Sequence, residues 1–346
     1  MKKNRIAIGT RGSKLALWQA EWIQSEVKKL HPHLEIELVK IKTTGDKILD
    51  VPLAQVGGKG LFVKEIEEAL LRYEVDIAVH SMKDVPTEFP DNLHLTVICK
   101  REDPRDAFIA SKKLKVKSEK VGRGITRSLI YDLPQMAKIG TSSLRRSCQL
   151  LHIRPDLKIE QLRGNLDTRI RKLDEGQFDA IILAAAGVKR LGLQHRLTEI
   201  LPFEISLPAI GQGAVGIECR VDDAFINNLI APLNHSETFI CVTAERAFLK
   251  RLEGGCQVPI AAHARLERRA DGREQSSLHS SLLIMDGLVG AVNGDRLVNG
   301  HIDGESENAE ILGIRLAEDI LTRGAREILN EVYSRNLPPV NGDISS

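Results

Sequence analysis

The chain has few cysteines, few aromatic residues and almost no net charge, and each shortage argues against a class of protein. Its five cysteines are an odd number without a C-x-x-C pair, which argues against a disulfide framework and a thiolate zinc site. Aromatic residues make up 4% of the chain, too few for the stacking platforms of a nucleic-acid binder. A net charge of +2 gives no reason to expect a polyanionic partner.

Long apolar runs are also missing. No stretch of eighteen apolar residues occurs, so no membrane-spanning helix is predicted. Near the amino terminus, the apolar run at residues 6–8 stops at Gly9, far short of the core of an export signal. With 42% hydrophobic and 28% charged residues, the 346 residues are typical of an ordinary globular protein with two or three domains. We therefore expect a cytoplasmic protein.

Short apolar runs alternate with amphipathic segments over the first two-thirds of the chain, which is the pattern of an α/β protein with mainly parallel strands. Apolar residues at helical spacing predict a helix from Lys14 to Leu30 with Ser13 as its cap. A second helix should start near Asn165 and stop at Gly176. The predicted strands span residues 5–9, 36–41, 75–79, 95–99, 138–140, 158–162 and 180–184.

The pattern changes beyond Pro232. Helical segments at 238–252 and 309–333 bracket an alternating, glycine-marked stretch at 260–298, which predicts a small separate α+β domain. The Lys/Arg-rich segment 112–135 shows no periodicity and is expected to be a solvated surface loop, with a mobile cover over a site as the alternative. The tail from residue 338 is expected to be disordered.

Basic and hydroxyl residues directly follow five of the predicted strands. In an open parallel sheet, residues just past the carboxyl ends of the strands line the binding crevice. Arginine forks bind carboxylates or phosphates through two contacts, so this arrangement predicts a ligand with several anionic groups. No G-x-x-x-x-G-K-[ST] motif occurs, which argues against a nucleoside triphosphate. The segments are 10–13, 80–84, 100–101, 140–146 and 163–165, with Arg169 one helical turn further on.

Three further residues allow two interpretations each. Asp84 is an acid among bases: it could simply pair with Lys83, or it could transfer a proton or stabilise a developing positive charge. Lys59 lies on a glycine loop and could reach a carboxylate or belong to a plain surface turn. Cys256 follows two glycines outside any apolar run, whereas the other four cysteines occupy apolar surroundings. Its thiol could present itself to a ligand or carry one covalently, or it could be a turn cysteine of no consequence.

Seven ordered segments, spread from residue 10 to residue 259, form one pattern, and the resemblance they carry covers nearly the whole chain. They are TRGS at 10–13 continuing to LWQA at 17–20, GGKGLF at 57–62, HSMKDVP at 80–86, GTSSLRR at 140–146, RGN at 163–165, PAIGQG at 208–213 and EGGCQVP at 253–259. Together they resemble the hydroxymethylbilane synthase family, whose members are also called porphobilinogen deaminases. Two departures are Gln55, where family members often have a lysine, and the segment 112–135, which is longer than usual.

The resemblance implies a fold and an activity. The fold would have two α/β domains like those of periplasmic binding proteins, joined by a hinge, and a small C-terminal α+β domain. The activity would be that of a transferase in porphyrin and haem biosynthesis, which joins four porphobilinogen molecules head to tail, releases ammonia each time and yields hydroxymethylbilane. The expected domains are 1–100 with 213–232, 101–212, and 233–346.

The resemblance also implies the site. A dipyrromethane cofactor would be held by a thioether to Cys256, and Asp84 would assist loss of ammonia and stabilise cationic pyrrole intermediates. No metal is implied, and the protein would be a monomer with no nucleic-acid or membrane partner. The other cofactor-binding residues would be Ser81, Lys83, Asp84, Thr141, Ser142, Ser143, Arg145, Arg146, Arg163, Gly164, Asn165 and Gln212. Porphobilinogen would be bound by Arg11, Ser13, Gln19, Lys59, Arg101, Arg163 and Arg169.

A non-catalytic anion-binding or sensor protein is the main rival interpretation. It would share the two α/β domains and the arginine-lined crevice, but it would have no use for a thiol after Gly254 and Gly255. A covalent organic adduct on one cysteine would support the enzyme, and an unmodified chain would support the rival or a nucleic-acid binder.

Overall fold

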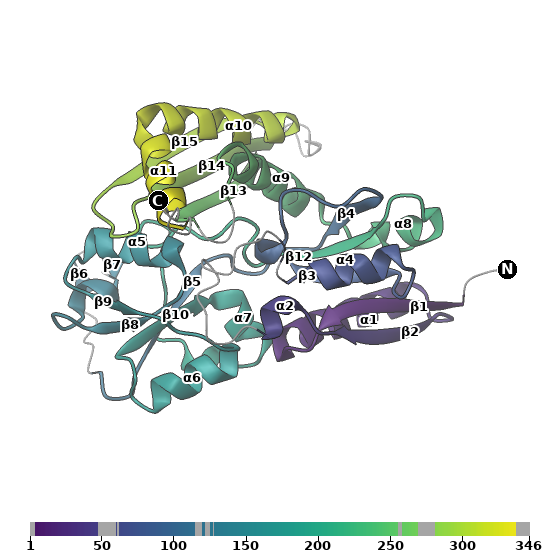
Figure 1. The fold of residues 1–346 in the computed structure, drawn as a ribbon, viewed down its shortest axis with the longest axis horizontal. Helices are drawn as coiled ribbons and strands as arrows, with labels where there is room; N and C mark the ends of the chain where they lie inside the picture. Colours follow the sequence, from purple (N-terminus) through teal and green to yellow (C-terminus); the bar gives the residue numbers. More distant parts are fainter. Residues whose placement is uncertain are drawn as a thin grey trace, which may run out of the picture.

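Three main sheets organise the chain. The computed structural model describes residues 4–47, 60, 62–114, 120–121, 125–126, 128–254, 258–268 and 281–336. Within these residues there are two five-stranded sheets, one three-stranded sheet and one two-stranded sheet. Figure 1 shows the two large sheets side by side, with the third sheet and its helices above them. Cys256, Lys59 and the tail after residue 336 lie outside the described residues.

The first sheet has the strand order β2-β1-β3-β12-β4. β1 pairs in parallel with β2 and β3, and β12 is antiparallel to both β3 and β4. Helices α1 and α8 pack on one face of this sheet, and α4 packs on the other. The bounds are β1 Arg5–Arg11, α1 Lys14–Leu30, β2 Glu35–Ile41, α2 Thr44–Lys47, α4 Lys64–Leu71, β3 Ile77–Ser81, η1 Met82–Asp84, β4 Leu93–Ile98, β12 Val215–Arg220 and α8 Ala224–Ile230.

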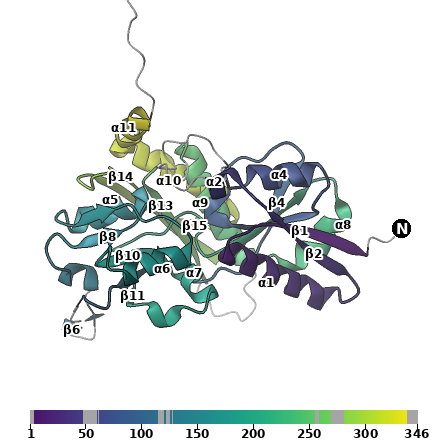
Figure 2. The same ribbon diagram turned by 60° about the horizontal axis from the view of Figure 1, so that its bottom comes forward.

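The second sheet has the order β11-β5-β10-β8-β9. β8 pairs in parallel with β10 and β9, and β5 is antiparallel to β10 and β11. Helix α5 covers one face, and α6 and α7 cover the other (Figure 2). The bounds are β5 Asp106–Ala110, η2 Leu129–Asp132, β8 Lys138–Gly140, α5 Leu144–Ile153, β9 Lys158–Glu160, α6 Leu166–Asp174, β10 Ala180–Ala184, α7 Ala185–Arg190, η3 Gln194–Arg196 and β11 Glu199–Ile200.

Each large sheet contains one strand that is antiparallel to the others: β12 in the first sheet and β5 in the second. Each of these strands directly follows a crossing of the chain from one sheet to the other. The chain leaves the first sheet after β4 and enters the second as β5, and it returns from β11 to β12. The remaining strands of each sheet share one direction, so the prediction of mainly parallel strands is confirmed. Their carboxyl ends therefore lie at one edge of each sheet.

The helix predicted over residues 14–30 is confirmed. The Ser13 side chain accepts a hydrogen bond from the Ala16 amide at 3.3 Å and caps the first turn. Ala20, Ile23 and Val27 form its fully buried stripe against the first sheet. The cap and the apolar spacing together explain why this segment is helical.

The third sheet and three helices form the predicted α+β unit. Strands β13, β14 and β15 are antiparallel, and α9 and α10 enclose a common apolar core with them. The single helix expected at 309–333 is instead two helices, because Gly324 has φ +105° and interrupts the helical path. The bounds are η4 Ala231–Leu233, α9 Ser236–Arg251, β13 Ile260–Arg268, β14 Ser281–Gly290, β15 Leu297–Glu305, η6 Ser306–Asn308, α10 Ala309–Ile320, η7 Leu321–Ala325 and α11 Arg326–Asn336.

The fold class is thus confirmed as two α/β units with a smaller α+β unit, whereas the exact domain boundaries stay predictions. Within the segment 112–135, the short strands β6 (Lys120–Val121) and β7 (Ile125–Thr126) pair with each other. An ion pair of 2.6 Å between Lys14 and Asp167 joins α1 of the first unit to α6 of the second.

Candidate functional site

The ends of strands from both α/β units meet in one cluster of charged side chains. Lys83 and Asp84 follow β3, and Arg146, Arg163 and Arg169 come from the second unit. Burial lowers the pKa of Lys83 below its usual range; Asp84 raises that pKa, and Arg146 and Arg169 lower it further. These mutual effects require the groups to be neighbours. We call Lys83, Arg146, Arg163 and Arg169 the cationic cluster.

Arg169 belongs to the same electrostatic system. Its pKa is lowered to about 10, mainly by burial and also by the charges of Arg146 and Arg163, against the opposing effect of Asp84. Its Nε donates to the Gly164 carbonyl at 2.8 Å. An anion near Arg169 would offset this repulsion between like charges, so the cluster is suited to bind carboxylate groups.

The buried side chain of Met82 anchors the turn that carries Lys83 and Asp84. Met82 is 1% exposed, and the backbone of Gly211 packs against it. Gly211 has φ +67°, and a Cβ there would lie 2.8 Å from the Met82 Cβ, so only glycine fits this approach. With Met82 buried, the two residues after it remain half-buried at the end of β3.

Several predicted ligand residues also shape the backbone around the cluster. Ser143 caps α5 by accepting from the Arg146 amide, and Asn165 caps α6 by accepting from the Thr168 amide at 3.0 Å. The N-termini of both helices thereby lie beside the arginines, where their free amide groups favour anions. Thr141 accepts from the Ser143 amide at 3.2 Å, and Ser142 donates to a backbone carbonyl at 2.8 Å.

Gln19 and Ser81 form a polar pair in the first unit. The Gln19 side chain is 2% exposed, its Nε2 donates to the Ser81 Oγ at 2.9 Å, and the Ser81 Oγ lies 3.0 Å from Gln19 Oε1. The pair connects α1 to the end of β3, directly before the turn that carries Asp84.

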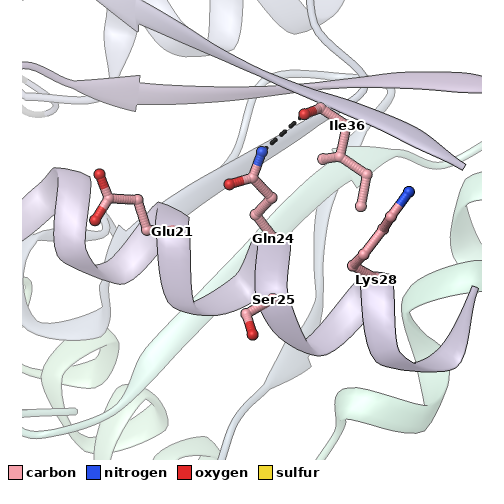
Figure 3. A pocket seen from close by; sticks show the side chains of 5 residues that line it. All are labelled: Glu21, Gln24, Ser25, Lys28 and Ile36. Carbon is pink, nitrogen blue, oxygen red and sulfur yellow. Dashed lines mark hydrogen bonds between the residues drawn. The ribbon is translucent and has the colours of Figure 1, made fainter. Parts of the chain in front are cut away.

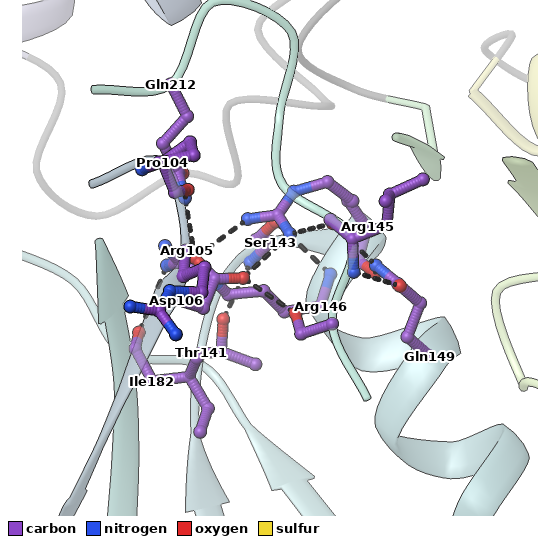
Figure 4. Close-up of polar contacts among 12 residues, drawn as sticks. Pro104, Arg105, Asp106, Thr141, Ser143, Arg145, Arg146, Gln149, Ile182 and Gln212 are labelled. Atoms are coloured by element: carbon purple, nitrogen blue, oxygen red, sulfur yellow. Dashed lines mark hydrogen bonds and ion pairs between the residues drawn. The ribbon is translucent and has the colours of Figure 1, made fainter. Parts of the chain in front are cut away.

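Arg145 and Arg146 both bind Asp106, a residue for which the sequence analysis assigned no role. Asp106 is fully buried and accepts two hydrogen bonds from each arginine and one from Gln212 (Figure 4). It accepts a sixth from the Ser206 hydroxyl. Burial by itself would raise the pKa of Asp106, but the two guanidinium groups hold it well below its usual range. The Nη1 atoms of Arg145 and Arg146 also donate to backbone carbonyls.

Arg101 and Arg11 likewise have internal carboxylate partners. Both Nη atoms of Arg101 donate to Glu245, at 2.6 and 3.1 Å, and Glu245 is fully buried. The Nε of Arg101 donates to the Gln212 carbonyl at 2.8 Å. Arg11 pairs with Asp46 at 2.5 Å, and about a quarter of its side chain is exposed. Glu245 and Asp46 had no role in the sequence analysis either, because nothing local marks a carboxylate whose partner lies far along the chain.

The described cysteines are all buried. Burial raises the pKa of each of their thiols to about 12, so they are poor nucleophiles at neutral pH. Of the loop that leads to Cys256, the structure describes Glu253 and Gly254. The Tyr333 hydroxyl donates to the Glu253 carbonyl at 2.8 Å, and Glu253 has φ +54°. The four cysteines are Cys99, Cys148, Cys219 and Cys241.

Two hollows lie outside the cationic cluster. One, of about 280 Å³, lies between α1 and β2, where Gln24 donates to the Ile36 carbonyl at 2.7 Å (Figure 3). The other, of about 420 Å³, is lined by Thr87, Glu88, Lys250, Glu253, Gly254 and Tyr333. None of the predicted site residues among the described ones lines either hollow. No helix in the described part of the chain is long and apolar enough to cross a membrane.

Comparison with known proteins assigns the chain to a family. A model described as "Porphobilinogen deaminase, dipyromethane cofactor binding domain" matches residues 6–228, and one for the C-terminal domain of porphobilinogen deaminase matches residues 239–322. The porphobilinogen deaminase of Geobacter sulfurreducens is 56% identical over 337 residues, covering 97% of this chain and 98% of that protein. The chain belongs to the porphobilinogen deaminase family. A second relative, from Pelobacter propionicus, is 53% identical over 97% of this chain and all of its own length.

Membership in the porphobilinogen deaminase family settles the activity and the cofactor. The protein is an enzyme that polymerises porphobilinogen into hydroxymethylbilane, a transferase reaction of tetrapyrrole biosynthesis, and its cofactor is dipyrromethane. Among solved structures, the probable amino-acid ABC transporter extracellular-binding protein YtmK from Bacillus subtilis matches with a TM-score of 0.40 and 14% identity, covering 67% of this chain and 90% of that chain.

Proposed function

We propose that elongation of the pyrrole chain takes place at the cationic cluster, with Asp84 as the catalytic residue. The observation that carries this proposal is the position of Asp84: it influences the pKa of both Lys83 and Arg169, and no described side chain donates a hydrogen bond to it. Its carboxylate oxygens are therefore available to a substrate. A carboxylate in this position can accept a proton and lower the energy of a cationic transition state.

The residues present fit a dipyrromethane cofactor, whose pyrroles carry carboxylate side chains. When bound, the cofactor supplies the pyrrole end to which the growing chain is attached. We propose that the cationic cluster and the N-termini of α5 and α6 hold its carboxylates, together with the predicted ligands Ser81, Thr141, Ser142, Ser143, Arg145, Gly164, Asn165 and Gln212. Arg145 and Arg146 would bind the cofactor with N–H groups that are not bonded to Asp106. Their hydrogen bonds to backbone carbonyls would also orient the backbone around the site.

We propose Cys256 as the attachment residue. The support is chemical: the four described cysteines are buried, and the pKa of each thiol is about 12, so none of them is suited to form a thioether. Their unpaired state also agrees with a reducing compartment, and we propose a cytoplasmic enzyme. A monomer without nucleic-acid or membrane partners is proposed on the family resemblance.

The substrate would be held by residues from both α/β units. Arg163 and Arg169 would bind the carboxylates of porphobilinogen, supported by Ser13, Gln19 and Lys59. Arg11 would exchange its Asp46 partner for a substrate carboxylate. Arg101 would support the site through the Gln212 carbonyl, because both its Nη atoms are held by Glu245.

In the proposed reaction, the aminomethyl group of porphobilinogen, which is an ammonium group at neutral pH, leaves as ammonia. The cationic pyrrole that remains is stabilised by the negative charge of Asp84. Coupling to the pyrrole end of the chain releases one ring proton, which the Asp84 carboxylate can accept. The arginines and Lys83 hold the carboxylates of both partners in place, so that the reacting carbons meet in a fixed orientation.

The test is Asp84→Asn, which keeps the size of the side chain but removes its charge. We expect intact protein mass to show the cofactor still attached and peptide mapping to place it on Cys256. Single-turnover elongation should slow by on the order of a hundredfold or more. Asp91→Asn, at an exposed aspartate of the same unit, should elongate at the parent rate. Parent-rate elongation by Asp84→Asn, or a variant that lacks the cofactor altogether, would contradict the catalytic role.

A further inference from the structure

Arg246 reaches from the third unit to the backbone directly after Asp84. It lies on α9, and its two Nη atoms donate to the carbonyls of Val85 at 3.3 Å and Pro86 at 2.6 Å. Its guanidinium carbon lies 5.4 Å from the centre of the Phe89 ring. One side chain thus holds two successive peptide groups of the loop that follows the proposed catalytic residue.

The guanidinium of Arg246 has carbonyl partners and no ion pair with a described carboxylate. Burial lowers its pKa to about 10, against the opposing effect of Glu218. Burying this charge costs free energy, and the hydrogen bonds to the two carbonyls offset part of that cost. The contacts are therefore not those of a surface arginine.

Both peptide groups of Val85, the residue after Asp84, are held by hydrogen bonds. The Val85 amide donates to the Met82 carbonyl at 3.2 Å and ends the turn Met82–Asp84. The Val85 carbonyl then accepts from Arg246. Asp84 is therefore bounded on one side by the buried Met82 and on the other by a peptide group fixed to α9.

The other end of α9 leads toward Cys256. The helix spans Ser236–Arg251, and after it the Gly254 amide donates to the Leu249 carbonyl at 3.0 Å. Arg246 of α9 therefore binds the loop after Asp84, and the C-terminal end of the same helix leads into the segment that carries Cys256. Glu245, next to Arg246 on this helix, binds Arg101 of the first passage between the sheets.

We propose that Arg246 is a positioning residue, which holds residues 85 and 86 to α9 and so fixes Asp84 relative to the helix that leads to the cofactor cysteine. The proposal rests on the proposed roles of Asp84 and Cys256. An error of about 1 Å in the position of a reacting group can slow a reaction by about a hundredfold. A link between these two elements therefore bears on rate even though Arg246 touches neither reacting atom.

The experiment is a double-mutant cycle of Arg246→Gln and Asp84→Asn on cofactor-loaded enzyme. Arg246→Gln in the parent should slow single-turnover elongation by about tenfold or more, with little change in KM and with the cofactor still attached by mass. In the Asp84→Asn background the same substitution should change the rate by less than about twofold, because the group it positions is already lost. Arg246→Lys keeps the charge but cannot bind both carbonyls through a planar guanidinium, so it should give an intermediate rate. It replaces Arg246→Gln in the cycle if that variant does not fold.

Arg154 provides the matched control. Its Nη1 also donates to two backbone carbonyls, those of Ile130 at 3.0 Å and Tyr131 at 3.1 Å, in a segment of the second unit away from the cationic cluster. Arg154→Gln should lower the melting temperature but leave the elongation rate of the folded enzyme unchanged. Equal slowing by Arg246→Gln in both backgrounds, or no slowing at all, would overturn the positioning role. A parent rate for Asp84→Asn alone would instead overturn the assignment of Asp84, and with it any action of Arg246 through that residue.

Discussion

Asp84 and Asp106 are two aspartates in the same neighbourhood, and their surroundings differ in one decisive respect. Asp106 is fully buried and accepts six hydrogen bonds: two each from Arg145 and Arg146 and one each from Ser206 and Gln212. Asp84 is half-buried, and no described side chain donates to it. A carboxylate whose lone pairs are filled can only stabilise the fold, whereas one whose lone pairs are open can meet a substrate cation.

The basic residues at the strand ends also differ in whether an internal carboxylate binds them. Arg145 and Arg146 neutralise Asp106, and Arg101 neutralises Glu245, so part of the basic content at the strand ends is balanced within the protein. Arg163, Arg169 and Lys83 have neighbours of like charge, and the pKa of Lys83 and of Arg169 is lowered. A carboxylate of the proposed ligand would offset the repulsion between Arg169 and its neighbour Arg146.

The largest effect should come from Asp106→Asn. The substitution leaves two buried guanidinium groups without their counter-charge, and we expect it to lower the free energy of unfolding by about 3–5 kcal/mol. Because the pKa of Asp106 is depressed in the folded protein, its contribution is present above about pH 4 and is lost as the pH falls further. Denaturant unfolding at pH 7 measures the change.

Asp84→Asn is the matched control for stability, since it should change the free energy of unfolding by less than about 1 kcal/mol while it abolishes most of the activity. If the two variants lost equal stability, the contrast between a filled and an open carboxylate would be wrong.

A third acid, Glu67, should give an intermediate effect that depends on pH. It is 8% exposed, its Oε1 has no described hydrogen-bond partner, and burial together with the charge of Glu218 raises its pKa to about 7, against the effect of His80. A raised carboxyl pKa contributes stability below about pH 4.5, and this contribution is lost as the pH rises through 7.

Glu67→Gln removes this titration. We expect the variant to be more stable than the parent by about 1–3 kcal/mol at pH 8, with a smaller difference at pH 5. Unfolding curves across that pH range test it, and Glu68→Gln on the exposed side of α4 should follow the parent. A Glu67→Gln curve with the same pH slope as the parent would mean that Glu67 is ionised throughout the range.

The smallest effect should come from Ser206→Ala. The Ser206 hydroxyl donates to Asp106 at 2.7 Å, but five other hydrogen bonds to that carboxylate remain when it is removed. We expect a loss of about 1 kcal/mol in the free energy of unfolding, and none for Ser25→Ala at an exposed position of α1. A loss as large as that of Asp106→Asn would show that the donors act as one cooperative unit.

Features with a local cause could be predicted. The helix over Lys14–Leu30 follows from its cap and its apolar spacing, and strands 138–140 and 180–184 follow from short apolar runs between polar punctuation. The break in the last helix was missed, although Gly324 marks it, because the apolar periodicity continues on both sides. The strand expected at 75–79 begins instead at Ile77, since the Asp76 side chain accepts a hydrogen bond from the Ala7 amide and Val75 lies outside the ladder.

The sequence by itself determined the fold class, the order of the strand-end motifs and the family, because these depend on local patterns that can be seen along the chain. Only the tertiary structure decided which arginines bind internal carboxylates, and that Arg169 lies close enough to Asp84 for the charge of Asp84 to affect its pKa. The partners of Asp106 lie 39 to 106 residues away from it, and Arg246 acts on peptide groups 160 residues away. Whether a charge is balanced depends on burial and on neighbours brought together by folding, and no local pattern in the sequence records either.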